Sequence, residues 1–188
     1  MKLDKLAKNI MDKQKKNIAL MGHMGSGKSV LGKLISKQLN FNHVDSDKLI
    51  EKKSNKTINE IFQTKGESYF RLTEENVILE TIYQKKLVLS LGGGSILSPK
   101  IRKALKGNFL TVFLDVDFAI LSKRLIKSKR RPLINDTNIE EKIKELDAIR
   151  RKFYLLADIT LKNHLTITDA LAEFRKKYIE FYEKYNSN

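Results

Sequence analysis

The chain has 188 residues, a length typical of one domain. It contains no cysteine, which excludes disulfide scaffolds, thiolate metal sites and cysteine nucleophiles. Its longest apolar runs fall far short of the ~20 residues of a transmembrane helix, and the stretch 1–16 lacks the apolar segment of a secretory signal peptide. We therefore expect a cytoplasmic protein with no membrane partner.

The charge balance is strongly basic, because 37 Lys and Arg residues outnumber 22 Asp and Glu residues and give a formal net charge of +15. The basic residues are spread along most of the chain, which favours solvated helix faces over one basic surface for a polyanion. They are denser in 1–16 and in 123–131, with six basic residues in each segment. We expect no nucleic-acid partner.

Short apolar runs alternate with longer segments of helical periodicity, a pattern typical of an α/β protein with a parallel sheet. We predict a three-layer fold in a domain at 17–175, between an N-terminal extension at 1–16 and a C-terminal tail at 176–188. The predicted five strands are 17–21, 41–45, 87–91, 109–114 and 159–161. The predicted helices are 28–39, 47–70, 73–84, one that begins at 99, 117–128, one that ends at about 156, and 168–185.

Three local signals predict where helices begin. Thr57 and Glu60 have the spacing of a capping box, in which each side chain bonds the other residue's backbone amide. Ser98 followed by Pro99 places a capping hydroxyl before a proline at the first helical position. Asp117 is a third candidate cap, directly after the fourth predicted strand.

The segment Gly22–Ser29 (GHMGSGKS) matches the phosphate-loop pattern G-x-x-x-x-G-K-[ST] and lies between a predicted strand and a predicted helix. Its glycines let backbone amides point at phosphate oxygens, and the start of the helix adds positive potential. Lys28 is expected to be solvated in the empty loop and to reach the β- and γ-phosphates, whereas His23 is expected to face solvent. The predicted nucleotide-binding residues of this segment are Gly25, Ser26, Gly27, Lys28, Ser29 and Val30.

A phosphate loop by itself does not distinguish a GTPase, a motor ATPase, a nucleotide kinase and a metabolite kinase, and the chain has no Asn-Lys-x-Asp for guanine. Asp45 and Asp47 end the second predicted strand, and Gly92–Gly94 ends the third. Ligands of open α/β sheets bind at these carboxyl ends. We expect one carboxylate to hold Mg²⁺ through water and the other to accept a substrate hydroxyl. The alternatives are turn or cap aspartates and a flexible glycine loop.

Together these motifs resemble the shikimate kinase family. The resemblance covers about 17–172 and rests on five motifs in order: Gly22–Ser29, Asp45-x-Asp47, Gly66–Arg71 (GESYFR), Gly92–Gly94 and Arg131-Pro132-Leu133, with Arg150-x-x-x-Tyr154 after them. It implies a P-loop NTPase fold of the nucleoside monophosphate kinase type, with a substrate-binding insert at about 46–74 and a lid at about 125–138. It also implies transfer of the ATP γ-phosphoryl group to the 3-hydroxyl of shikimate, with Mg²⁺, in aromatic amino acid biosynthesis.

The resemblance also implies a role for each matching residue. Asp47 would bind the shikimate hydroxyls and assist loss of the proton, while Asp45 and Ser29 would hold Mg²⁺. Planar guanidinium groups suit carboxylates, so Arg71, oriented by Glu74, and Arg150 would bind the shikimate carboxylate. The backbone of Gly92, Gly93 and Gly94 would contact the substrate hydroxyls, Arg124 would lie against adenine, and Arg131 would contact the ATP phosphates. The implied catalytic residues are Asp47, Lys28 and Arg131.

Two other functions are kept as alternatives. A related metabolite kinase such as a gluconate kinase shares the phosphate loop and lid. A phosphate-loop protein that binds nucleic acid would use the positive charge, but the aromatic residues Tyr178, Phe181, Tyr182 and Tyr185 have the spacing of helix packing. The segment 161–164 lacks the Asp-Thr of the family's adenine loop, and a monomer is expected.

Overall fold

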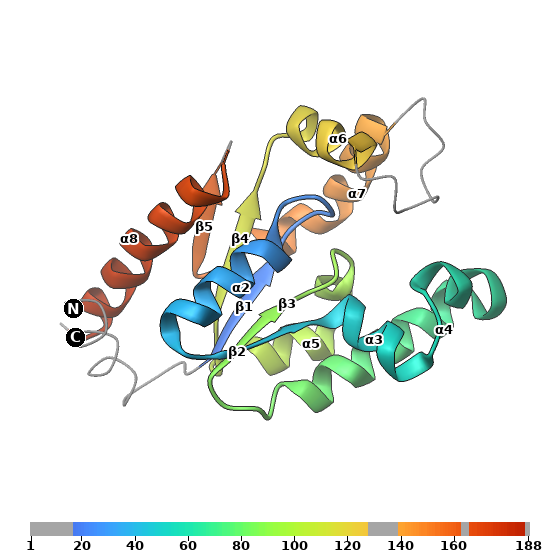
Figure 1. The fold of residues 1–188 in the computed structure, drawn as a ribbon, viewed down its shortest axis with the longest axis horizontal. Helices are drawn as coiled ribbons and strands as arrows, with labels where there is room; N and C mark the ends of the chain where they lie inside the picture. Colours follow the sequence, from blue (N-terminus) through green and yellow to red (C-terminus); the bar gives the residue numbers. More distant parts are fainter. Residues whose placement is uncertain (1–16, 128–138, 163–165, 187–188) are drawn as a thin grey trace.

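Five parallel strands form one sheet in the order β2-β3-β1-β4-β5 in the computed structural model, which describes residues 17–127, 139–162 and 166–186 (Figure 1). The strands are β1 (Asn17–Met21), β2 (Asn42–Asp45), β3 (Leu87–Ser90), β4 (Phe109–Asp115) and β5 (Ile159–Lys162). In the central register, Ala19 of β1 pairs with Leu89 of β3 and with Thr111 of β4. All five predicted strands are confirmed within one residue or so at each end.

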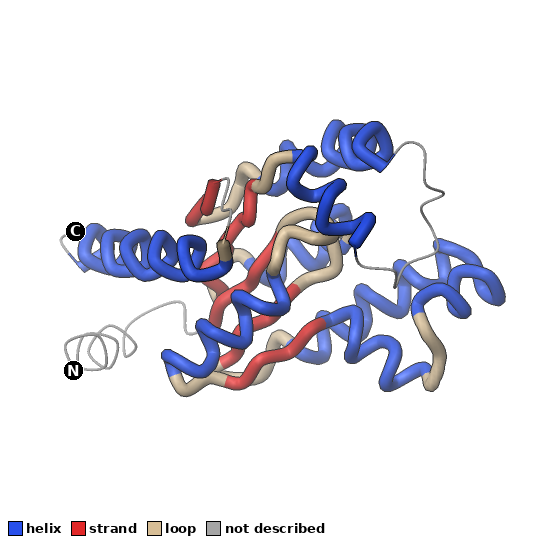
Figure 2. Tube along the Cα trace, turned by 45° about the horizontal axis from the view of Figure 1, so that its top comes forward, coloured by secondary structure: helices blue, strands red, loops and turns tan. Residues whose placement is uncertain are grey.

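Successive residues of the central strand alternate between two cores, as the pleat of a strand requires. Ile18 and Leu20 face one core, which is closed by α2 (Lys28–Leu39) and α8 (Ile167–Asn186). Ala19 and Met21 face the other, which includes residues of α4 (Ile58–Thr81), α5 (Pro99–Leu105) and α7 (Ile139–Tyr154). Helices therefore cover both faces of the sheet, which confirms the predicted three layers (Figure 2).

The insert between β2 and β3 differs from its predicted helices. It consists of α3 (Ser46–Ser54) and of α4, which continues through 71–73, where a break was predicted. The break lies earlier because Asn55 takes a left-handed conformation, and Thr57 and Glu60 then form the predicted capping box. A small core of its own, around Ile50, Ile61, Phe70 and Val77, holds the two helices together.

Two of the remaining helices begin at their predicted caps. Ser98 Oγ accepts a hydrogen bond from Ile101 N at 3.2 Å to begin α5, and Asp117 Oδ1 accepts one from Ala119 N at 2.9 Å before α6 (Phe118–Lys127). A short 3-10 helix, η1 (Ser95–Leu97), precedes α5. Within the described ranges, no helix combines the length and hydropathy needed to cross a bilayer.

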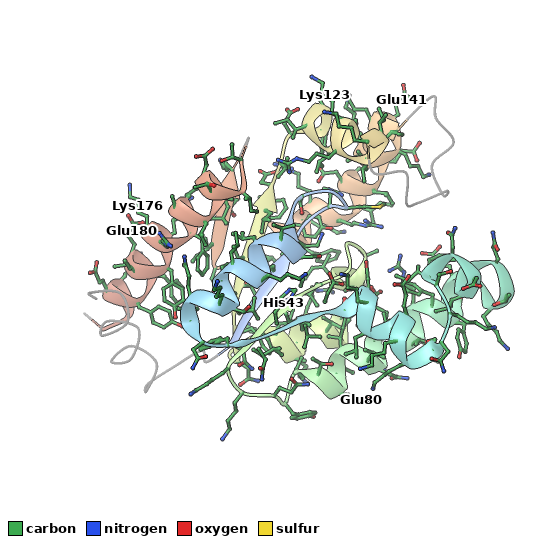
Figure 3. All side chains as sticks on the ribbon, in the orientation of Figure 1. His43, Glu80, Lys123, Glu141, Lys176 and Glu180 are labelled. Carbon is green, nitrogen blue, oxygen red and sulfur yellow. The ribbon has the colours of Figure 1, made fainter. Side chains whose placement is uncertain are left out.

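The charged side chains labelled in Figure 3 lie on the outer faces of the helices: Lys123 on α6, Glu141 on α7, and Lys176 and Glu180 on α8. Several lysines have acidic neighbours one helical turn away, among them Lys142 with Glu145 on α7 at 2.7 Å. The aromatic residues of α8 behave as predicted for helix packing, since Tyr178 and Tyr182 are buried in the core under that helix. Of the predicted segments, the N-terminal extension and most of the lid lie outside the described residues.

Candidate active site

The phosphate loop joins β1 to α2 at the edge of the sheet where all strands end (Figure 1). Gly25 and Gly27 have φ angles of 80° and 98°, which L-residues with side chains rarely adopt, so the turn needs glycine at both positions. Gly27 is also the cap of α2 and provides no side chain to bond its first amides. These geometries leave the helix N-terminus suited to an anionic ligand.

Two residues of the loop differ from their predicted surroundings. Lys28 was expected to be solvated, but it is half-buried and its Nζ donates hydrogen bonds to Gly22 O at 2.9 Å and His23 O at 2.8 Å. His23 was expected to face solvent, but only 5% of it is exposed. Its ring lies among Phe118, Tyr154 and Asp147, which come from segments more than 90 residues away and which no local pattern could reveal.

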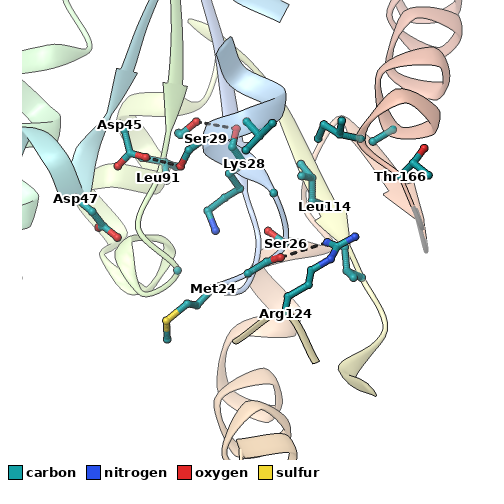
Figure 4. A pocket seen from close by; sticks show the side chains of 18 residues that line it. Met24, Ser26, Lys28, Ser29, Asp45, Asp47, Leu91, Leu114, Arg124 and Thr166 are labelled. Atoms are coloured by element: carbon teal, nitrogen blue, oxygen red, sulfur yellow. Dashed lines mark hydrogen bonds between the residues drawn. The ribbon is translucent and has the colours of Figure 1, made fainter. Parts of the chain in front are cut away.

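The phosphate loop opens into a cavity of about 440 Å³ (Figure 4). Ser29 Oγ donates a short hydrogen bond to Asp45 Oδ2, so the hydroxyl and the carboxylate expected at Mg²⁺ lie together. Asp45 also caps α3 by accepting from Lys48 N at 3.3 Å, which means that the functional and cap interpretations are compatible. The lining includes all the predicted nucleotide-binding residues of the loop, namely Gly25, Ser26, Gly27, Lys28, Ser29 and Val30.

Asp47 lies next to the glycine loop that follows β3. A Cβ atom built on Gly92 would lie 2.6 Å from Asp47 Oδ1 and 2.5 Å from Glu74 Oε1, closer than real Cβ contacts. Ser95 Oγ donates to the same Glu74 oxygen at 2.6 Å. The absence of a side chain at position 92 thus permits the aspartate and the glutamate to approach the loop from α3 and α4.

Arg71 reaches Gly94, the last glycine of that loop. A Cβ on Gly94 would overlap the Arg71 guanidinium group. That group donates hydrogen bonds to Glu74 at 2.8 Å and to Glu67 at 3.1 Å. Burial alone would lower the pKa of Arg71, but the charges and hydrogen bonds of Glu74 and Glu67 raise it above its usual value. The guanidinium therefore stays charged, and Glu74 orients it as the resemblance implies.

Arg150 approaches the same loop from the opposite side. A Cβ on Gly93 would lie 3.2 Å from Arg150 Nη1 and 3.4 Å from Gly22 O in the phosphate loop. One turn further along α7, Tyr154 donates from its hydroxyl to Gly93 O at 2.6 Å. Burial raises the pKa of Tyr154 to about 12, so this hydroxyl keeps its proton. The structure thus brings both arginines, Asp47 and the three glycines to one place beside the phosphate loop.

Beyond the phosphate loop, the cavity is lined by one further residue predicted to bind the nucleotide and by several that sequence analysis missed. Arg124 of α6 lines the cavity and donates to Gly25 O at 3.2 Å. Thr166, Ile167 and Ala170 also line it (Figure 4 labels Thr166), because α8 begins at the carboxyl end of β5. The predicted phosphate contact Arg131 lies outside the described residues.

Asp147 and Arg151 of α7 were also missed. Asp147 is buried and bonds the His23 ring at 2.7 Å, and Arg151 donates to Asp115 at 3.0 and 3.2 Å. Asp115 had been left open between a turn residue and a helix cap, and it forms an ion pair instead. The helical spacing of 147, 150, 151 and 154 was the available signal, since it places these residues on one face.

Comparison with known proteins agrees with this arrangement. The family model described as shikimate kinase matches residues 24–181. Shikimate kinase from Thermoanaerobacter pseudethanolicus is 36% identical over 165 residues, which cover 87% of this chain and 96% of the relative. The solved structure of shikimate kinase from Acinetobacter baumannii in complex with shikimate has a TM-score of 0.83 at 33% identity and covers 93% of this chain and 97% of that one.

A gluconokinase structure from Sinorhizobium meliloti has a TM-score of 0.65 at 17% identity and covers 93% of this chain and 98% of its own. At that identity the likeness concerns the fold alone, whereas the family model and the relatives at higher identity extend over most of the sequence. With the phosphate loop, the glycine loop and the two arginines assembled at one edge of the sheet, the chain belongs to the shikimate kinase family.

Proposed function

We propose that this kinase transfers the γ-phosphoryl group of ATP to the 3-hydroxyl of shikimate, in the pathway to the aromatic amino acids. The observation that carries the proposal is the convergence of Asp47, Arg71 and Arg150 on the Gly92–Gly94 loop, directly beside the phosphate loop. A substrate with hydroxyls and one carboxylate matches one acid and two guanidinium groups. The phosphate loop supplies the second substrate's site in the adjoining cavity.

The nucleotide would bind in the cavity beside the phosphate loop. Its phosphates would replace the carbonyl oxygens of Gly22 and His23 as partners of the Lys28 ammonium group. The amides at the start of α2 would contact the same phosphates. Arg124, which lines the cavity, would lie against the base, and Arg131 would add a further positive charge from the lid.

The acceptor would bind against the insert formed by α3 and α4. We propose about 46–74 as the part of this insert that binds it. Its carboxylate would lie between the Arg71 and Arg150 guanidinium groups, which flank the glycine loop. Because Glu74 and Glu67 already orient Arg71, little side-chain entropy remains to be lost when the carboxylate binds. The backbone of Gly92–Gly94 would contact the hydroxyls.

In the chemical step, the 3-hydroxyl oxygen of shikimate forms a bond with the γ-phosphorus. The bond between that phosphorus and the oxygen bridging it to the β-phosphate breaks, and ADP leaves with that electron pair. The hydroxyl proton passes to the Asp47 carboxylate and then to solvent. Positioning and charge neutralisation provide most of the acceleration in such transfers, and Asp47 and Lys28 would supply them here.

Mg²⁺ fits the oxygen donors near the phosphate loop. Ser29 Oγ and Asp45 Oδ2 share a hydrogen bond there, and hard oxygen ligands suit this ion. Within the described residues no group of three or more His, Cys, Asp or Glu side chains could hold a metal ion. Ser29 would hold Mg²⁺ directly and Asp45 through water, and the bound ion would neutralise phosphate charge.

A coupled assay of ADP release with ATP and Mg²⁺ tests the proposal. The acceptors are shikimate, gluconate and further hydroxy acids at equal concentrations, and formation of the 3-phosphate is checked by phosphorus NMR. We expect turnover with shikimate at a rate at least ~100-fold above the others, since the two-arginine site and Asp47 must be filled together. Equal or faster turnover of gluconate would support the gluconate kinase alternative instead.

We further propose that the enzyme is a monomer. Charged residues paired along the outer helix faces support the proposal that the +15 charge serves no nucleic acid. A gel shift with DNA and RNA at about 50 mM and 200 mM salt tests this, because phosphate-driven binding falls steeply with salt. We also propose a cytoplasmic location, where ATP and Mg²⁺ are available.

A further inference from the structure

Helix α7 is joined to three loops at the edge of the sheet that forms the site. Tyr154 bonds the glycine loop after β3, and Arg151 forms an ion pair with Asp115 at the end of β4. Asp147 bonds His23 of the phosphate loop. These residues share one face of the helix with Arg150, because they lie three, four or seven positions apart.

The contact between His23 and Asp147 is the most buried of the three. Its partners are 5% and 6% exposed, and His23 Nε2 lies 2.7 Å from Asp147 Oδ1, where a neutral imidazole donates to the carboxylate. The His23 ring also packs edge-on against Tyr154, with centroids 5.2 Å apart. A charged hydrogen bond shielded from water is stronger than a neutral exposed one, so this contact firmly connects the two segments.

His23 does not belong to the nucleotide-binding surface itself. His23 is not among the described residues that line the cavity, where the contribution of this segment comes from residues 24–30. Its imidazole instead points toward α7, whereas sequence analysis predicted that it would face solvent. The residue therefore occupies a phosphate-loop position while its side chain serves another element.

Arg150 lies one helical turn beyond Asp147 and depends on the position of the helix. Its Nε is buried without a hydrogen-bond partner among the described residues, and its guanidinium group bonds Tyr154 of the same helix, whereas Arg71 is oriented by two glutamates. The Arg150 guanidinium lies against Gly93, where a Cβ atom would be 3.2 Å from Nη1. A small shift of α7 relative to the phosphate loop would therefore move this guanidinium away from the glycine loop.

We propose that His23 and Asp147 are a positioning pair that fixes Arg150 for the substrate carboxylate by joining α7 to the phosphate loop. This inference rests on the proposed function, in which Arg150 binds that carboxylate. His23 and Asp147 touch neither substrate. Their effect is on the affinity for the acceptor and passes through helix α7.

The test is a double-mutant cycle with His23→Phe and Asp147→Ala, measured as KM for shikimate, KM for ATP and kcat. His23→Phe keeps an aromatic ring against Tyr154 and removes only the hydrogen bond. We expect each single variant to raise KM for shikimate about tenfold, the size of one charge-assisted hydrogen bond, with KM for ATP within about twofold. Asp147 also accepts a hydrogen bond from Arg151 at 3.4 Å, so Asp147→Ala removes that ion pair as well. The double variant should have the same KM for shikimate as Asp147→Ala, because His23→Phe removes a contact that Asp147→Ala has already removed.

Two further variants separate positioning from folding. Asp147→Asn retains an acceptor oxygen for the imidazole N–H and should recover most of the affinity for shikimate, also where Asp147→Ala folds poorly. Glu145→Gln removes an exposed pair with Lys142 on the solvent face of the same helix and should change nothing. Lower melting temperatures with unchanged KM for shikimate, or equal losses for ATP and shikimate, would overturn the proposal.

The wild-type enzyme distinguishes a failure of this inference from a failure of the proposed function. If the wild type phosphorylates shikimate and the variants keep its KM, only the positioning pair is wrong. If the wild type does not use shikimate at all, the proposed function is wrong, and the positioning pair falls with it.

Discussion

Lys28 stabilises the empty phosphate loop as well as its ligand, because its Nζ donates to two carbonyl oxygens of that loop. Lys28→Ala should lower turnover at least ~100-fold through the loss of one cation at the transferred phosphate. It should also lower the melting temperature by a few degrees, since two half-buried hydrogen bonds are lost.

The control for Lys28→Ala is Lys37→Ala, which removes an exposed lysine from the same helix. Steady-state kinetics and thermal melting of both variants provide the measurement. Turnover of Lys28→Ala within tenfold of wild type would contradict the assignment of the loop.

Arg71 and Arg150 flank the glycine loop from α4 and α7, away from the phosphate loop's own ligand cavity. Arg71→Ala and Arg150→Ala should each raise KM for shikimate by roughly 10–150-fold, the equivalent of ~1.5–3 kcal/mol for a hydrogen bond to a charged group. KM for ATP should stay near the wild-type value, and Asp47→Asn should lower kcat more than either KM.

The matched control is Arg175→Ala on α8, where an exposed arginine bonds only Gln38 among the contacts described. Initial rates over a grid of ATP and shikimate concentrations separate the two KM values. An equal weakening of both substrates in all three site variants would be incompatible with separate subsites.

At the scale of the element, α4 depends on the kink at Gly66. Its φ of 79° and ψ of 173° are open only to glycine, although a Cβ there would touch nothing within 4 Å. The cost of Gly66→Ala is therefore backbone strain of about 1–3 kcal/mol. We expect a lower melting temperature and a raised KM for shikimate, because the second half of α4 carries Arg71.

Lys65→Ala is the control for the kink, since it places alanine at the preceding exposed helical position. Circular dichroism melting and shikimate kinetics should leave this control unchanged. A Gly66→Ala enzyme as stable as wild type would mean that α4 tolerates a straight path and that Arg71 is not placed by the kink.

At the scale of the whole molecule, stability should fall in weak acid because of two histidines, the buried His23 and the half-buried His43. Burial lowers the pKa of His23 below 6.5, despite the bond to Asp147, and burial also lowers the pKa of His43. The unfolded chain then binds protons more readily than the fold does. The histidines therefore contribute fully above pH 6.5, and this contribution is lost as the pH falls below it.

Melting temperatures from about pH 7.5 to about pH 5.5 measure this effect. His23→Phe should melt lower at neutral pH and lose less stability on acidification than wild type, with His43 supplying the remaining slope. Lys37→Ala should follow the wild-type curve, because this variant leaves both histidines in place. A His23→Phe curve parallel to that of wild type would show that His23 binds protons equally in both states.

Much of the fold and most of the site were predictable because their signals are local. The capping box at Thr57, the cap at Ser98 and the five apolar strands depend on neighbours within a few residues. The phosphate loop was predictable for the same reason, since glycine geometry and the following lysine lie within eight residues. The break between α3 and α4 was misplaced, because the left-handed Asn55 competes with helical periodicity.

The sequence by itself determined the parallel α/β architecture, the phosphate loop and the residue types that we propose for the two substrate sites. Only the tertiary structure decided that His23 is buried against Asp147, that Asp115 pairs with Arg151, and that Arg71 and Arg150 meet Gly94 and Gly93. These contacts join residues between 23 and 124 positions apart, and their geometry depends on strand order and on how α4 and α7 pack. Local periodicity contains no information about strand order or about the packing of these two helices. The residue types of the site could therefore be predicted from the sequence, but the contacts between them could not.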